Sequence, residues 1–209
     1  MIRELIQTPR EYFSERIKYP QLRMQSIFVA LAGLLTGVWR LGVHQDLGAA
    51  VSYIEDVLII LMFLSIAEFF LWWIFLTILM VLIANGFGGD ATIGGLLRLT
   101  GYGFLPLMLS GAIWSIGHYL ALQGATPPEP PLHAGFQYQY TRYDQFMEQA
   151  AGEPFLLGAL AFGTLFVLAA GYFWYHAVAV AAEVENNYAG LAAGIAVAIF
   201  LGRFLIPAI

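Results

Sequence analysis

Two charged residues lie within apolar stretches of the sequence, where an ionisable group is rare and could do chemistry. Glu68 stands in the run SIAEFFLWW, near the middle of one apolar segment, and Arg40 lies near the end of another. A charge at the centre of a membrane costs about 2.5–3.5 kcal/mol on insertion scales, so Glu68 should face the protein interior. It could bind a proton or a cation, or it could hydrogen-bond another helix or pair with Arg40. We favour the structural interpretation.

His176 and Glu183 are seven residues apart, a spacing that places both on one face of a helix. Such pairs are mostly interfacial polar residues, and an enzyme that uses this pair on lipid substrates is the weakest hypothesis. Ser115 and His118 also share a helical face, but no Gly-x-Ser-x-Gly motif surrounds Ser115. The sequence therefore gives no reason to expect catalytic residues.

The sequence also gives little evidence for a metal or cofactor site. The histidines are widely spaced and form no HExxH motif, and the nearest approach to a metal site would combine His44 and Asp46 with His133. The chain has no cysteine, which excludes disulfides, thiolate zinc sites and a cysteine nucleophile. We predict no catalytic residue, no metal and no cofactor, and a protein that is not an enzyme.

The composition indicates an integral membrane protein. Of the 209 residues, 60% are hydrophobic and only 11% are charged, whereas a soluble domain has about 25% charged residues. The net charge of −5 argues against a nucleic-acid partner. The environment that this composition requires is a lipid bilayer.

Apolar segments of membrane-spanning length follow one another along the chain, and a span needs about 20 residues. They cover residues 24–43, 57–84, 100–122, 155–182 and 189–206. We predict an all-α fold in which residues 24–209 form a bundle of five transmembrane helices. Residues 1–23 are polar, and Tyr12, Phe13 and Ile17 predict a short amphipathic helix in the membrane interface.

A glycine-dense stretch joins the second and third segments. Its glycines can adopt positive φ at little steric cost, so they end one helix and turn the chain. They are Gly86, Gly88 and Gly89. Asp90 or Thr92 can then cap a short helix that carries Arg98. The stretch has no Gly-Lys-Ser/Thr motif, so it is no phosphate-binding loop, and the simplest interpretation is a tight turn.

Small residues spaced four apart let two helices approach closely in a membrane. Gly33 and Gly37 form such a pair in the first segment, and Gly190 and Gly194 form one in the last. We expect these two faces to mediate self-association or contact with another membrane protein. The third segment is the richest in small residues and should be the packing centre of the bundle.

The basic residues predict the orientation in the membrane. Five spans place six Lys and Arg residues on the side of the N-terminus and three on the other. The N-terminus is then cytoplasmic and the C-terminus outside the cell membrane, with the glycine-rich bend and the link at 183–188 in the cytoplasm. The loop at 123–154 lies outside, and we interpret its aromatic residues as interfacial rather than as a recognition surface. They are Phe136, Tyr138, Tyr140, Tyr143 and Phe146.

Several of these features together resemble the Yip family of Rab-interacting membrane proteins with five spans, in its prokaryotic branch. The resemblance rests on the opening TPREYF, the glycine-rich turn followed by GYGFLP, a penultimate span with a tryptophan, and a last small-residue helix that ends near Pro207. Family members often carry a Lys-Ala pair in the last link. This chain departs from that pattern with Glu183, Glu185, Asn186 and Asn187.

The resemblance implies a non-enzymatic membrane protein that acts as a scaffold and binds partners, in membrane organisation or a trafficking-like role. In eukaryotic relatives the partners are Rab GTPases. The alternative from another class is a small transporter or channel that uses Glu68. A second polar residue at the depth of Glu68 would favour transport, and Thr164 is the nearest polar residue on the fourth segment.

Overall fold

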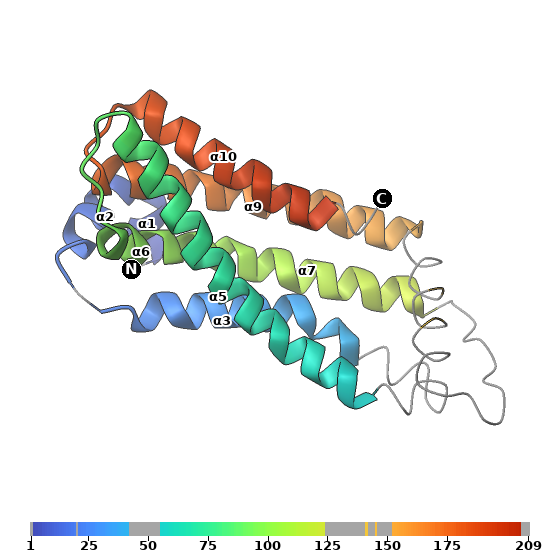
Figure 1. Cartoon of the computed structure of the whole chain (residues 1–209). Helices are drawn as coiled ribbons and strands as arrows, with labels where there is room; N and C mark the ends of the chain where they lie inside the picture. Colours follow the sequence, from blue (N-terminus) through green and yellow to red (C-terminus); the bar gives the residue numbers. More distant parts are fainter. Residues whose placement is uncertain are drawn as a thin grey trace, which may run out of the picture.

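The computed structural model describes residues 2–19, 21–41, 55–123, 141, 145 and 152–205 (Figure 1). The main elements of that part are all helical. They are α1 (Ile2–Gln7), α2 (Pro9–Arg16), α3 (Arg23–Gly37), α5 (Glu55–Gly86), α6 (Ile93–Thr100), the 3₁₀ turn η2 (Gly101–Gly103), α7 (Phe104–Leu122), α9 (Pro154–Ala181) and α10 (Asn186–Leu205).

The predicted all-α, polytopic fold is confirmed. Four helical stretches among the described residues are long and apolar enough to cross a membrane: Arg23–Leu41, Asp56–Gly86, Ile93–Leu122 and Pro154–Ala181. The helix α10 is a further apolar helix, and its 20 residues cover about 30 Å at ~1.5 Å per residue. Each predicted segment therefore overlaps a helix among the described residues.

The stretch that contains α7, Ile93–Leu122, is the most buried of the four membrane-spanning stretches, as its small residues predicted, although α9 contacts more of the other helices. The helix α7 packs against α9 on one side and α3 on the other. The helix α5 packs on α3, and α10 packs on both α9 and α5, so these helices close a ring. Figure 1 shows that α5 crosses the bundle obliquely, beside α10 at the end that carries α1 and α2 and away from it toward the opposite end.

Gly33 and Gly37 lie against α5 within the same chain. A Cβ on Gly33 would stand 2.7 Å from the carbonyl oxygen of Ser65, and one on Gly37 would stand 3.1 Å from the carbonyl oxygen of Met62. The predicted close approach of a neighbouring helix is confirmed. The same contact corrects the expectation of self-association at this face, because α5 already covers it.

The N-terminal segment is helical, but it forms two short helices, α1 and α2, where we expected one. Leu5 and Phe13 are fully buried, and Tyr12 is 6% exposed. The helix α2 lies against α9 and α6. Burial of these side chains explains why the segment folds back onto the bundle, and its location in the membrane interface stays a prediction.

Candidate functional site: the bend and the link at one end of the bundle

The end of the bundle that carries α1 and α2 also gathers two short connections, seen at the left of Figure 1. The bend, residues 87–92, joins α5 to α6, and the link, residues 182–185, joins α9 to α10. We call the bend and the link together the bend–link unit. Its local geometry follows from a few residues.

The bend is a hydrogen-bonded turn. Gly88 has a φ of +86°, which side chains other than glycine rarely adopt. Asn85 spans the turn, because its Oδ1 accepts from the N–H of Ala91 over 2.8 Å and its Nδ2 donates to the Ala91 carbonyl oxygen over 3.0 Å. The Thr92 hydroxyl then caps α6 by accepting from the N–H of Gly95 over 3.1 Å. A positive-φ glycine and the Thr92 cap are thus confirmed.

Asp90, the other predicted cap, joins the bend to the link instead. Its backbone N–H donates to the carbonyl oxygen of Ala182 over 3.1 Å. Gly89 lies so close to the link that a Cβ there would stand 3.0 Å from the Ala182 oxygen and 2.6 Å from Cγ1 of Val184. Two segments far apart in the sequence are therefore fixed to each other through the backbone. A Cβ at position 89 would also stand 2.9 Å from the Ala84 carbonyl oxygen, so a side chain there would force the backbone to shift.

The link starts with a left-handed residue, which corrects the expected relation between His176 and Glu183. The helix α9 ends at Ala181, and Glu183 has a φ of +52°, uncommon for a residue with a side chain. Glu183 therefore does not continue the helical face of His176. His176 is half-buried on α9, with the rings of Tyr172 and Tyr175 at 4.6 and 4.8 Å from its own.

An aromatic pair and three carboxylates face outward from the unit. Phe87 stacks on Tyr188 of α10, with ring centroids 4.5 Å apart and 11° between the ring planes. Asp90, Glu183 and Glu185 are exposed. The surface of the bend–link unit is therefore both aromatic and acidic.

Thr100 joins α6 to two membrane-spanning helices beside it. Its hydroxyl accepts from Nε1 of Trp73 over 3.1 Å and lies 2.8 Å from the hydroxyl of Thr77 on α5. Its carbonyl oxygen accepts from Nε1 of Trp174 on α9 over 3.0 Å. Gly103 lies against that indole, where a Cβ would collide with it. These bonds satisfy buried groups that would each cost about 1–3 kcal/mol if left unpaired.

Arg98 and Tyr102 hold the N-terminal helices in place. The Arg98 guanidinium donates to the carbonyl oxygen of Ile17 over 3.0 Å, just after α2 ends, where a cation also meets the negative end of the helix dipole. Tyr102 is buried against the rings of Tyr12 and Phe13, with centroids 5.4 and 5.9 Å away. We interpreted the glycine-rich stretch as a tight turn. In the structure, this stretch and the η2 turn that leads into α7 organise this end of the bundle.

Glu68 and Arg40 lie on the membrane-spanning helices, away from the bend–link unit. Glu68 is half-buried and accepts a hydrogen bond of 3.3 Å from Nε1 of Trp72. Arg40 donates to the Ser65 hydroxyl over 3.0 Å and lies over the Trp39 ring, 4.9 Å from its centroid. Arg40 thus reaches α5 at a residue three positions before Glu68.

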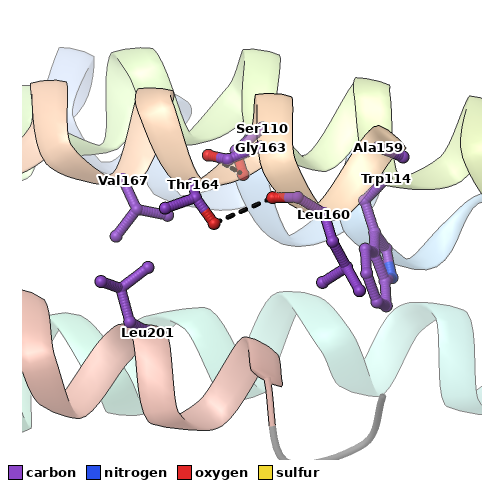
Figure 2. Close-up of a pocket in the computed structure, with 8 residues that line it drawn as sticks. All are labelled: Ser110, Trp114, Ala159, Leu160, Gly163, Thr164, Val167 and Leu201. Atoms are coloured by element: carbon purple, nitrogen blue, oxygen red, sulfur yellow. Dashed lines mark hydrogen bonds between the residues drawn. The ribbon is translucent and has the colours of Figure 1, made fainter. Parts of the chain in front are cut away.

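Thr164 lines a small pocket between α7, α9 and α10 with a cavity volume of only about 10 Å³ (Figure 2). The Thr164 hydroxyl turns back and donates to the carbonyl oxygen of Leu160 over 2.8 Å. Ser110 donates to the carbonyl oxygen of Gly163 over 3.1 Å. Both hydroxyl protons at the pocket are thus used by backbone carbonyl oxygens. The other lining side chains are mostly apolar.

Gly190 and Gly194 face away from the bundle. Nothing lies within 4 Å of a Cβ built on either residue, apart from the local helix and chain neighbours. The buried face of α10 carries Ala192, Ala193 and Ala196 instead. The small-residue face of the last helix is therefore open among the described residues, unlike the face at Gly33 and Gly37.

Some predicted features lie outside the described residues. They are His44, Asp46, His133 and the aromatic residues Phe136, Tyr138, Tyr140, Tyr143 and Phe146. Within the part of the chain that the structure describes, no group of three or more His, Cys, Asp or Glu residues is placed to hold a metal ion.

Sequence reasoning missed the residues that fix this end of the bundle. Trp73, Trp174, Thr100 and Asn85 carried no prediction, although each makes a bond that positions the bend or α6. The available signal was a threonine directly before the Gly-Tyr-Gly of η2, together with a tryptophan in each of two spans. It does not show which of these side chains meet.

Comparisons with known proteins identify a family to which the chain is similar. No curated protein and no solved structure matches the chain significantly. The family model of the Yip1 domain matches residues 3–206, from α1 through α10 and including the bend and the link. Because this match covers nearly the whole chain, the protein belongs to the Yip1 domain family.

Proposed function

We propose that the protein is a non-enzymatic membrane scaffold of the cell membrane that binds partner proteins at the bend–link unit. The observation that carries the proposal is the lock between bend and link, made by the Asp90–Ala182 backbone bond and the close approach at Gly89. Binding residues are commonly placed on loops that a rigid scaffold holds in position. A surface fixed before a partner arrives costs less conformational entropy when it binds.

The non-enzymatic part of the proposal is supported by the placement of the candidate polar residues. Glu183 leaves the helical face of His176, so the spacing that suggested a cooperating pair is not realised. His176 packs among tyrosine rings. The orientation is supported by the six basic residues on the side of the N-terminus, which favour a cytoplasmic location for the bend–link unit.

Transport through Glu68 is the second candidate function. It rests on the half-burial of Glu68 within a helix long enough to cross a membrane. The expected companion, Thr164, donates to its own helix and does not supply a polar path. Proton and cation flux in reconstituted liposomes separates the two functions. The scaffold predicts no flux from wild type or Glu68→Gln, whereas flux that Glu68→Gln abolishes would establish transport.

Partner binding is tested by photo-crosslinking in the membranes of expressing cells. A photoreactive amino acid at Ile93, which is 50% exposed and directly follows the bend, probes the proposed surface. The same amino acid at Glu153, exposed at the start of α9, probes the opposite end of the bundle. We expect discrete protein adducts from position 93 and none from position 153. The proposal fails if position 93 gives no adduct or if both positions give the same products.

A further inference from the structure

The exposed surface of the bend–link unit centres on Phe87 and Tyr188. One face of the Phe87 ring lies on Tyr188, 4.5 Å away, while the side chain of Phe87 is 48% exposed. Phe87 directly follows α5 and Tyr188 lies in the first turn of α10, so two packed helices fix the pair. A rigid, partly exposed aromatic ring is typical of the centre of a protein interface.

Negative charge adjoins the aromatic pair. Asp90, Glu183 and Glu185 are exposed, and within the described residues no ion pair joins any of them to a cation. The bend and the link contain no Lys or Arg. Arg98, the next basic residue along the chain from the bend, donates to Ile17 instead. The surface therefore complements a positively charged partner.

Two other possible occupants, an anionic membrane surface and a metal ion, fit this surface poorly. An anionic membrane surface attracts basic segments, so it would repel the three carboxylates. A metal ion needs several converging ligands, and no such group of His, Cys, Asp and Glu occurs in the described part of the chain. A cationic side chain fits, because an aromatic face and a carboxylate both attract it.

We propose that the bend–link unit binds a basic, arginine-bearing segment of a partner protein. The inference rests on the proposed function and adds the chemistry of the partner. A guanidinium group stacks on the open face of Phe87, and neighbouring cations pair with Asp90, Glu183 and Glu185. Arginine suits this surface better than lysine, because its planar ion both stacks on rings and forms two parallel hydrogen bonds to one carboxylate.

Peptide binding to the purified full-length protein in nanodiscs of neutral lipid tests the inference. The probes are fluorescein-labelled peptides of equal length that alternate serine with arginine, lysine or glutamate, and binding is read as fluorescence anisotropy against empty nanodiscs. We expect the arginine peptide to bind more tightly than the lysine peptide and the glutamate peptide not to bind. The affinity for the arginine peptide should fall as salt rises, because salt screens exposed ion pairs.

Matched variants assign the binding to this surface. The tip variant, which combines Asp90→Asn, Glu183→Gln and Glu185→Gln, should weaken binding of the arginine peptide about tenfold, because it removes three exposed ion pairs. The control combines Glu11→Gln, Glu15→Gln and Glu153→Gln, which removes the same charge from exposed positions elsewhere and should leave the affinity unchanged. Phe87→Leu keeps an apolar side chain but should abolish the preference for arginine over lysine.

Several outcomes overturn the inference. They are no binding to the wild type, equal affinities of the tip variant and the control, and equal binding of arginine and glutamate peptides. If the wild type self-associates and only the tip variant becomes monomeric, the occupant is a second copy and the partner assignment is wrong. Crosslinks from Ile93 that persist in the tip variant would leave the scaffold function standing while this inference falls.

Discussion

The indole nitrogen of Trp174 donates a hydrogen bond of 3.0 Å to the carbonyl oxygen of Thr100. This bond joins α9 to the last residue of α6, and the Thr100 hydroxyl joins the same point to α5. Buried hydrogen bonds between spans therefore set where the chain enters α7. The position of the bend–link unit depends on them as well as on its own glycines.

The change Trp174→Phe should destabilise the protein by about 1–3 kcal/mol, because it leaves the buried Thr100 carbonyl oxygen without its indole donor. The measurement is the free energy of unfolding in detergent. Trp72→Phe serves as the control, because its indole is only half-buried and its bond to Glu68 is longer, at 3.3 Å. An equal loss of stability in both variants would contradict the special role of the Trp174–Thr100 bond.

The change Gly89→Ala should separate the bend from the link, because the new Cβ would stand 3.0 Å from the Ala182 carbonyl oxygen and closer still to Val184. We expect a loss of about 1–3 kcal/mol in the free energy of unfolding, as for other overpacked sites. Gly86→Ala is the matched control, since nothing lies within 4 Å of a Cβ there. If Gly89→Ala is as stable as Gly86→Ala, the close approach of the bend to the link does not contribute to the stability of the protein.

The change Arg98→Gln should loosen the N-terminal helices from the bundle, because it removes the charged donor to Ile17. We expect faster amide hydrogen exchange across α1 and α2, with an opening free energy lower by about 1.5–3 kcal/mol at most. Arg23→Gln, an exposed change at the start of α3, is the control. If amide hydrogen exchange in α1 and α2 is unchanged in the Arg98→Gln variant, Arg98 does not hold these helices against the bundle.

The sequence predicted the helices well, because a membrane span needs a long apolar run and turns between spans need glycine or polar residues. Gly88 and Thr92 were predictable for the same local reason, since each acts on the backbone beside it. The hydrogen bond between Trp174 and Thr100 was not predictable, because it joins segments far apart in the chain. Apolar spans carry little periodicity that would show which face is buried.

The glycine pairs show the same limit. Gly37 and Gly194 have equivalent sequence patterns, but one packs on α5 and the other faces outward. Glu183 shows a second limit, because its left-handed backbone ends the helical face on which its spacing from His176 would have placed it. Spacing along the chain predicts a shared face only while the helix continues.

The two glycine pairs should therefore respond differently to the same change. Gly37→Ala places a Cβ 2.8 Å from the Ser65 hydroxyl oxygen and 3.1 Å from the Met62 carbonyl oxygen. It should lower the free energy of unfolding by about 1–3 kcal/mol. Gly194→Ala meets nothing within 4 Å and gains helix propensity, so its stability should be unchanged or slightly higher. If Gly194→Ala lost more stability than Gly37→Ala in detergent unfolding, the assignment of the two helix faces would be wrong.

The central claim is that partner binding depends on the bend being fixed to the link. Its most direct test is photo-crosslinking from Ile93 in membranes that contain the wild type, Gly89→Ala or Gly86→Ala at equal protein levels. The scaffold account predicts that the partner adduct is lost in Gly89→Ala and kept in Gly86→Ala. An adduct of undiminished yield in Gly89→Ala, with the bend displaced from the link as measured by amide exchange at Asp90, would contradict it.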